Sequence, residues 1–278
     1  MTYTETLSWG EETLRKAGIA GFKKDTELLL MHVTGKDKTF LLTHGGEESL
    51  ENSELEKFKA FIDRRSSHIP LQLITGHADF MGLDFLVSKD VLIPRIDTEF
   101  LVEEAMRYVC DGADVLDMCT GSGCILLSLM KYKNGIMGTG ADISPAALLL
   151  AGKNAERLGV KNAVFIESDL FSNVEGRFDH ILCNPPYIRS GDIADLMEEV
   201  RDHEPHLALD GGEDGLEFYK RIASEAGDHL RGGGQMFLEI GFDEGEAVSE
   251  ILKDAGYKNV EVIKDYSGNE RVVTCLKS

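Results

Sequence analysis

The residues of this chain best suited to chemistry are Asn184-Pro185-Pro186-Tyr187, directly after a short apolar run from Phe178 to Cys183. The run predicts a buried strand, because it is short and is bounded by Gly176 and the prolines. The Asn184 side-chain oxygen and the Pro185 carbonyl are two acceptors for the hydrogens of a planar NH2 group, and Tyr187 can lie on its face. Hydrogen bonds of this kind localise the nitrogen lone pair and aim it at an electrophile. The corner therefore predicts a site for an amide or an aromatic amine.

The same four residues also suit an ordinary turn that closes a strand, because Asn and Pro are typical turn residues. The pattern nevertheless resembles the [N/D/S]-P-P-[Y/F/W] signature of methyltransferases that act on exocyclic amino groups and amides. Ligands of open α/β sheets bind at the carboxyl ends of the strands, where this corner would lie. We therefore predict that Asn184, Pro185 and Tyr187 are catalytic and that Asn184, Pro185, Pro186 and Tyr187 bind the substrate.

A second polar turn follows an expected strand at 114–118 and precedes an expected helix at 124–132. The dinucleotide fingerprint needs a third glycine, and position 126 is Leu, so an NAD or FAD pyrophosphate site is disfavoured. An acid, a small-residue turn and a helix N-terminus suit a ligand with an amino acid carboxylate and a ribose, as in S-adenosylmethionine. The predicted cofactor residues here are Asp117, Cys119, Thr120, Gly121, Ser122 and Gly123.

Two further acids follow the next expected strands. Asp142 ends the strand 135–141, where a bidentate carboxylate can hold a ribose diol. Its alternative role as a helix cap is better filled by Ser144, because Pro145 follows at the first helical position. Asp169 ends the strand 164–167 and can accept from the adenine amine beside Leu170, although a solvated loop acid is the competing interpretation. Asn184 completes the predicted cofactor contacts.

Composition limits the function classes. The chain has 278 residues and a formal charge of −20, which argues against a sequence-tolerant nucleic-acid binder. Its five cysteines are odd in number and form no Cys-x-x-Cys pair, so neither a disulfide framework nor a zinc site is expected. The N-terminus lacks an apolar signal segment and no run is long enough to span a bilayer, so we expect a cytoplasmic protein.

Residues 1–76 predict a helical domain, with helices at 7–17, at 26–33 capped by Asp25, and at 54–65 capped by Ser53. Residues 77–94 predict a β-hairpin linker. A helix capped by Asp97 or Thr98 then opens the main domain, 95–278.

The main domain alternates strands and helices, which predicts an α/β fold with a mostly parallel sheet and an antiparallel edge. The last expected elements are helices at 216–230 and 244–255 and strands at 235–240, 260–263 and 272–276. From Asp192 to Glu217 the chain carries ten Asp or Glu against the single Arg201. Such a charge run is either a solvated face or a surface for a basic protein partner.

With these residues in place, the chain resembles the HemK/PrmC family of protein glutamine N5-methyltransferases almost end to end. The resemblance rests on motifs that are specific in combination: Phe85 to Glu99 with Ile-Pro-Arg-x-Asp-Thr-Glu at its end, Thr120-Gly-Ser-Gly123, Asn184-Pro-Pro-Tyr-Ile188, Glu204-Pro205 with Leu207-Ala-Leu209, and Gly211-Gly-x-Asp-Gly-Leu216.

The resemblance implies a class I S-adenosylmethionine-dependent domain, with a seven-stranded Rossmann-like sheet, behind a helical domain that docks the substrate protein. It implies methylation of the glutamine in the Gly-Gly-Gln motif of class 1 peptide-chain release factors, by a monomer without direct nucleic-acid binding. The chain departs from the family at Cys119, a position usually Gly, and at Leu170, a position often Trp. Alternatives are a DNA adenine-N6 methyltransferase, disfavoured by the acidic balance, and a non-catalytic cofactor-binding module.

Overall fold

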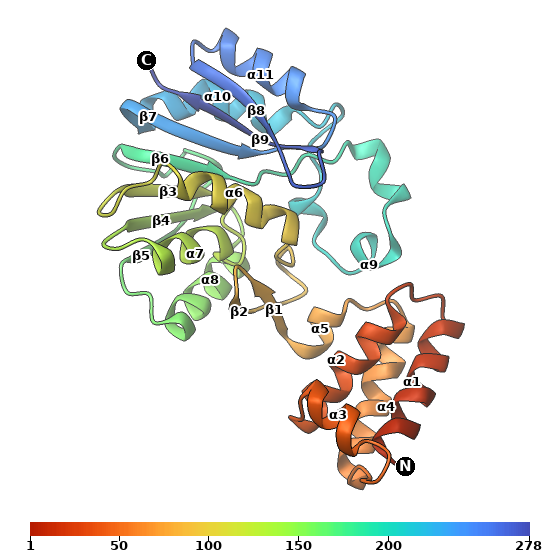
Figure 1. Cartoon of the computed structure of the whole chain (residues 1–278). Coiled ribbons are helices and arrows are strands. Elements are labelled where there is room, and N and C mark those ends of the chain that lie inside the picture. Colours follow the sequence, from red (N-terminus) through yellow and green to blue (C-terminus); the bar gives the residue numbers. More distant parts are fainter. The chain divides into compact units, whose positions relative to one another are not determined.

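The structure is a computed structural model that describes residues 1–278, and the chain forms two compact units. One unit contains residues 1–76 together with 197–203, and the other contains 77–196 and 204–278. Figure 1 shows a set of helices in the first unit and a sheet between helices in the second. No helix of the structure is long and apolar enough to cross a membrane.

The first unit is helical around a small apolar core. Its helices are α1 (Tyr3–Lys16), α2 (Phe22–Thr34), α3 (Lys38–His44), α4 (Asn52–Ser66), α5 (Leu71–Thr75) and α9 (Glu198–Arg201). Leu14, Leu29, Leu30 and Phe58 are fully buried at its centre, and the Trp9 ring lies edge-on against Phe58 with centroids 6.2 Å apart. The helices therefore bury one apolar face each, as their periodicity predicts.

Both predicted helix caps in this unit are wrong. The residue before α2 is Gly21, and Asp25 lies inside the first turn, where its carboxylate accepts from Nε of Arg65 at 2.7 Å. Helix α4 begins after Glu51, which forms a capping box with Glu54, so Ser53 is helical. A carboxylate pair therefore caps α4, whereas α2 begins at a glycine without a side-chain cap.

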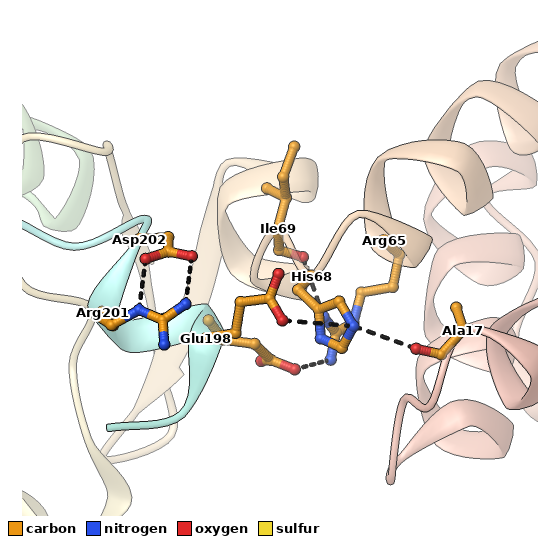
Figure 2. Close-up of polar contacts among 8 residues, drawn as sticks. Ala17, Arg65, His68, Ile69, Glu198, Arg201 and Asp202 are labelled. Atoms are coloured by element: carbon orange, nitrogen blue, oxygen red, sulfur yellow. Dashed lines mark hydrogen bonds and ion pairs between the residues drawn. The ribbon is translucent and has the colours of Figure 1, made fainter. Parts of the chain in front are cut away.

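Residues 197–203 group with the helical unit because α9 contacts α4 and its following turn. Arg65 is 4% exposed and donates through Nη2 to Glu199 Oε1 at 2.5 Å, through Nε to Asp25, and through Nη1 to the Ile69 carbonyl at 3.2 Å. Figure 2 shows the bond from Arg65 to the Ile69 carbonyl beside His68, whose ring bonds to the Ala17 carbonyl. A segment that follows Tyr187 by only ten residues in the sequence is thus part of the helical unit.

The second unit is built on a seven-stranded sheet with the order β5-β4-β3-β6-β7-β9-β8. All neighbours pair in parallel except β9, which is antiparallel to β7 and to β8. The strands are β3 (Asp114–Met118), β4 (Met137–Asp142), β5 (Ala163–Glu167), β6 (Phe178–Cys183), β7 (Leu230–Glu239), β8 (Lys258–Lys264) and β9 (Glu270–Leu276). This confirms the predicted α/β fold with an antiparallel edge.

Helices cover both faces of this sheet. The helices are α6 (Ile96–Met106), α7 (Cys124–Tyr132), α8 (Pro145–Leu158), α10 (Glu217–His229) and α11 (Gly245–Asp254), with short 3₁₀ turns at Ser190–Asp195 and His206–Ala208. Leu182 and Phe237 pack with α6 and α7, whereas Ile181, Cys183 and Leu238 pack with residues of α10 and α11. The side chains alternate between the faces, so each strand is buried on both sides.

Two local predictions in this unit are wrong. The hairpin is limited to β1 (His77–Phe80) and β2 (Leu83–Leu86), and the apolar run at 91–93 is loop instead of strand. Helix α6 begins after Arg95, so Asp97 and Thr98 are inside the helix and neither caps it. The Ser144 cap of α8 is confirmed, because its hydroxyl accepts from the backbone N–H of Ala147 at 3.3 Å.

Candidate active site

The site lies at the carboxyl ends of β3, β4, β6 and β7. Here the strand order reverses, because β4 and β5 are added on one side of β3 and β6 and β7 on the other. Met118 is opposite Ala141 on one side and Cys183 on the other, and Cys183 is opposite Leu238. The next residue after each of these four therefore lies at the same edge of the sheet: Cys119, Asp142, Asn184 and Glu239. Because the strand order changes direction at β3, the crevice beyond these ends is the expected ligand site of such a sheet.

A cavity of about 310 Å³ occupies this edge. It is lined by most of the predicted site residues, namely Cys119, Thr120, Gly121, Ser122, Asp142, Asp169, Leu170, Asn184 and Pro186. Asp117, Gly123, Pro185 and Tyr187 are not among its lining residues. Segments with no role in the sequence prediction also line it, among them the 90–95 loop and Leu207.

Asp142 is joined to the small-residue turn by its own carboxylate. Oδ2 accepts from the backbone N–H of Gly121 at 2.8 Å, and Oδ1 accepts from that of Ser144 at 2.9 Å. Each oxygen keeps a further lone pair for a diol. Burial raises the pKa of Asp142, against the effect of these backbone bonds. The acid is therefore positioned by the fold before any ligand binds.

The turn itself requires left-handed backbone at two glycines on either side of Ser122. Gly121 has φ 55° and Gly123 has φ 78°, and a Cβ on Gly123 would lie 3.0 Å from Leu127 and 3.2 Å from Ala151. Gly123 thus allows α7 to pack closely on α8 and does not need to touch a ligand. Cys119 also has a positive φ of 59°, which a glycine would adopt without strain.

Asp117 is fully buried beneath the turn instead of lining the cavity. Its Oδ2 accepts from the Thr120 hydroxyl at 2.6 Å, and its Oδ1 has no hydrogen-bond partner. Burial raises the pKa of Asp117 to about 7, although the bond from Thr120 opposes this change. The structure thus gives Asp117 a contact that supports the turn.

Asp169 and Leu170 lie at the far side of the cavity. Oδ1 of Asp169 accepts from Arg221 Nη2 at 2.7 Å, and both side chains are partly exposed. Leu170 is buried and has a φ of 47°, while its carbonyl accepts from Ser168 Oγ. Asp169 therefore has a partner that the sequence did not indicate, although it also lines the cavity.

The Asn184 amide has a defined orientation. Its Nδ2 donates to Thr98 Oγ1 at 3.2 Å, so Oδ1 is the end left for another donor. Tyr187 packs partly buried against the core on the α10 side. Burial raises the pKa of the Tyr187 phenol, and the carboxylate of Glu239 raises it further. Of the four consecutive residues predicted to bind the substrate, Asn184 and Pro186 line the cavity, and Pro185 and Tyr187 do not.

Sequence reasoning missed several residues that position this corner. Thr98 was assigned to a helix cap, and Glu239 was only the end of a strand. Glu204 is buried and accepts from the Ile93 N–H at 3.3 Å and from the Arg95 guanidinium, which fixes the loop beside the cavity. The only available signal for Glu204 was its place in a recognised motif, since its partners are more than 100 residues away.

The residues present fit S-adenosylmethionine. Asp142 offers two carboxylate oxygens for a ribose diol, and Val91, Ile143, Ala147 and Leu170 give the cavity an apolar part for an adenine ring. The volume lies at the lower end of the range of small-molecule sites.

Comparisons with known proteins show the family of this chain. Residues 5–76 match the PrmC N-terminal domain model, and residues 95–213 match the methyltransferase small domain model. A release factor glutamine methyltransferase from Clostridium acetobutylicum is 40% identical to the chain, with 100% of this chain and 99% of that protein covered.

Two solved structures share the fold. A methyltransferase from Pyrococcus furiosus aligns with a TM-score of 0.54 at 22% identity, covering 71% of this chain and 90% of that one. A 16S rRNA N2 G1207 methyltransferase from T. thermophilus, solved with AdoMet and guanosine, aligns with a TM-score of 0.52 at 20% identity, covering 73% of this chain and 50% of that one. With the full-length similarity above, the chain belongs to the release factor glutamine methyltransferase family.

Proposed function

We propose that this protein transfers the methyl group of S-adenosylmethionine to the side-chain amide nitrogen of the glutamine in the Gly-Gly-Gln motif of class 1 peptide-chain release factors. The observation that carries the proposal is the orientation of Asn184. Its NH2 group is bonded to Thr98, and the residue lines the cavity, so Oδ1 is the atom available to a substrate N–H. Family membership supports the choice of substrate.

The residues of the corner act by orientation. Asn184 Oδ1 and the Pro185 carbonyl accept the two amide hydrogens, which draws the nitrogen lone pair out of conjugation, and the Tyr187 ring lies against the amide plane. S-adenosylmethionine supplies the electrophilic methyl group. The methylated amide nitrogen is acidic enough to lose its proton to water, so this chemistry needs no side-chain base.

The cofactor would be held by the residues of the carboxyl edge. Asp142 takes the ribose diol, and the turn 119–123 takes the amino acid part through Thr120, Gly121 and Ser122. Asp169 and Leu170 take the adenine, and Asn184 lies at the methyl end. Asp117 supports Thr120 from below, and Gly123 allows the close packing of α7 and α8.

The domain roles are part of the proposal. Residues 1–76 dock the release factor, 77–94 link the domains, and 95–278 carry the reaction. The acidic stretch from Asp192 to Glu217 suits a basic protein surface, because release factors bind ribosomal RNA. The protein would act in the cytoplasm as a monomer, with a protein and not a nucleic acid as its substrate.

The direct test offers two substrates for one methyl donor. The protein is incubated with methyl-labelled S-adenosylmethionine and either a purified class 1 release factor or duplex DNA. Label should appear on the release factor and map by mass spectrometry to the Gly-Gly-Gln glutamine. A release factor with that glutamine replaced by alanine is the control and should stay unlabelled. Labelling of the DNA alone would replace the proposal by its closest rival.

A further inference from the structure

Glu239 is a buried carboxylate at the end of β7 that the reaction described above does not use. It is 1% exposed and follows Leu238, which is opposite Cys183, so it is level with Asn184 in the neighbouring strand. Because Phe237 packs with α6 and side chains alternate, Glu239 points to the same face, where Thr98 lies in α6. The carboxylate is therefore next to the substrate corner without lining the cavity.

Burial raises the pKa of this carboxylate and the hydroxyls of Thr98 and Tyr187 lower it, which places both hydroxyls beside it, while its Oε2 atom is buried without a partner. The observed bond runs from Asn184 Nδ2 to Thr98 Oγ1 at 3.2 Å, so Thr98 accepts there and its single hydroxyl proton is left for another acceptor. An ionised carboxylate only accepts hydrogen bonds, so Glu239 is a suitable acceptor for that proton.

We infer that Glu239 is a positioning residue that, through Thr98 and Tyr187, holds the Asn184 amide with Oδ1 toward the substrate and holds the Tyr187 ring. This inference rests on the proposed role of Asn184 as an acceptor for the substrate amide. If Thr98 instead donated to Asn184, the amide would turn by half a rotation and present its NH2 group to the substrate NH2. Two donors would then face each other, and the nitrogen lone pair would lose its orientation.

The surroundings of Glu239 make its charge sensitive to pH. Burial raises the pKa of Glu239 to about 7, while the Thr98 hydroxyl, the Arg271 charge and the Tyr187 hydroxyl oppose that change and the Asp97 charge adds to it. Arg271 is itself paired with Asp97 and Asp265, each at 3.2 Å. A protonated Glu239 can donate to Thr98, which frees the Thr98 proton for Asn184 Oδ1. The correct amide orientation should therefore be lost as Glu239 gains its proton.

The test compares three variants of the full-length protein with purified release factor as substrate. Glu239→Gln, which can donate as well as accept, should lower kcat about tenfold and leave the Kd for S-adenosylmethionine within about twofold of the parent. Thr98→Val, which keeps the shape and removes the hydroxyl, should lower kcat similarly. Thr98→Ser restores the hydroxyl and should return kcat to within about twofold of the parent.

A pH profile separates positioning from a merely structural role. In the parent, kcat should fall as pH drops from 8 to 6, and in Glu239→Gln this limb should be absent. The matched control is Glu244→Gln, because burial also raises the pKa of Glu244 to about 7, yet its Oε2 accepts from Gly241 N–H and from Tyr219. The control should keep the limb.

A double-mutant cycle then identifies the route of the effect. In an Asn184→Ala background, Glu239→Gln should lower the remaining kcat by less than about twofold, because the group it positions is gone. A full tenfold loss in that background, or equal kcat for Thr98→Val and Thr98→Ser, would overturn the inference. Normal turnover by Asn184→Ala alone would contradict the proposed role of Asn184 itself, which is a different outcome from failure of the inference about Glu239. Should Glu239→Gln not fold, the Thr98 pair decides the question.

Discussion

Arg65 donates through Nη2 to Oε1 of Glu199, a residue 134 positions later in the chain, at a distance of 2.5 Å. The guanidinium is nearly fully buried and also pairs with Asp25, so it has two carboxylates as partners. The Glu199 segment follows the substrate corner in the sequence and belongs to the helical unit. The pair therefore fixes the short helix α9 on α4.

Replacing Arg65 should destabilise the helical unit. Arg65→Ala leaves the Asp25 carboxylate without its partner and removes the bond to Ile69, so we expect a loss of about 3 kcal/mol in the free energy of unfolding. Denaturant titration followed by circular dichroism measures this loss. Arg64→Ala is the control, because Arg64 is exposed and only donates to the Leu73 carbonyl, and it should cost much less. Equal losses would show that the buried contacts contribute nothing specific.

Asp142 should be essential for cofactor affinity. Asp142→Ala removes two acceptors for the ribose diol and the bond that holds Gly121, so the Kd for S-adenosylmethionine should rise by roughly 30- to 1,000-fold, or about 2–4 kcal/mol. Isothermal titration calorimetry gives the Kd directly. Asp254→Ala, which changes an exposed acid at the end of α11, should bind like the parent. Parent-like binding by Asp142→Ala would remove the ribose role.

Asn184 should affect turnover more than cofactor binding. Asn184→Ala removes the proposed acceptor for the reacting amide, so kcat on the release factor should drop at least about 100-fold. Quenched-flow or steady-state assays with labelled S-adenosylmethionine measure it. Asn173→Ala, at an exposed asparagine, is the control. Near-normal turnover in Asn184→Ala would contradict the mechanism.

The acidic stretch from Asp192 to Glu217 should accelerate capture of the release factor. Raising salt from about 50 to 300 mM should lower kcat/KM for the whole factor several-fold and change it little for a Gly-Gly-Gln peptide. The double substitution Asp195→Asn and Glu213→Gln, at exposed positions, should weaken that salt dependence. The control is the double substitution Glu250→Gln and Glu261→Gln, which changes the net charge by the same amount at exposed positions outside the stretch. The control should leave the salt dependence unchanged. A salt-independent kcat/KM would exclude steering by this surface.

Because Asp117 is buried, the free energy of unfolding should fall as the pH rises. Its pKa is raised to about 7 by burial, above its ordinary value of 3.8, so between these values the folded protein binds more protons than the unfolded chain. The proton on Asp117 stabilises the fold fully at a pH below the pKa of Asp117 in the unfolded chain. This stabilisation is lost as the pH rises through the pKa of Asp117 in the folded protein. The free energy of unfolding falls by up to about 1.4 kcal/mol per pH unit between the two values. Asp117→Asn should flatten the decline between pH 5 and 7 in urea titrations. Parallel pH curves for both proteins would contradict this sign.

Local patterns in the sequence predicted the elements that carry the site. The strands 114–118 and 178–183 and the helix 124–132 have the predicted bounds, because each is a short apolar segment followed within three residues by Gly or Pro. The same patterns placed Cys119, Asp142 and Asn184 at strand ends, and parallel pairing brings such ends to one edge. The cavity therefore contains most of the residues predicted to touch the cofactor.

Apart from the Ser144 cap, the helix caps and the buried partners were decided only by tertiary structure. Ser53, Asp97 and Thr98 have the residue types of helix caps, yet Glu51 and Arg95 precede the two helices. Thr98 instead bonds with Asn184, 86 residues away, and a local pattern carries no information about a partner at that separation. The run at 91–93 looks like a strand, but no neighbouring strand pairs with it, and it lines the cavity as a loop.

The sequence by itself determined the order of the strands and long helices in the main domain, the Asn-Pro-Pro-Tyr corner and the acids at the strand ends, because these depend on residue type and on spacings of a few residues. Only the tertiary structure decided that Asp117 supports the turn from beneath, that Glu239 lies beside Thr98, and that α9 groups with the helical unit. The physical reason is that burial and long-range hydrogen bonds depend on which strands and helices are neighbours. That neighbourhood is set by the packing of the whole chain.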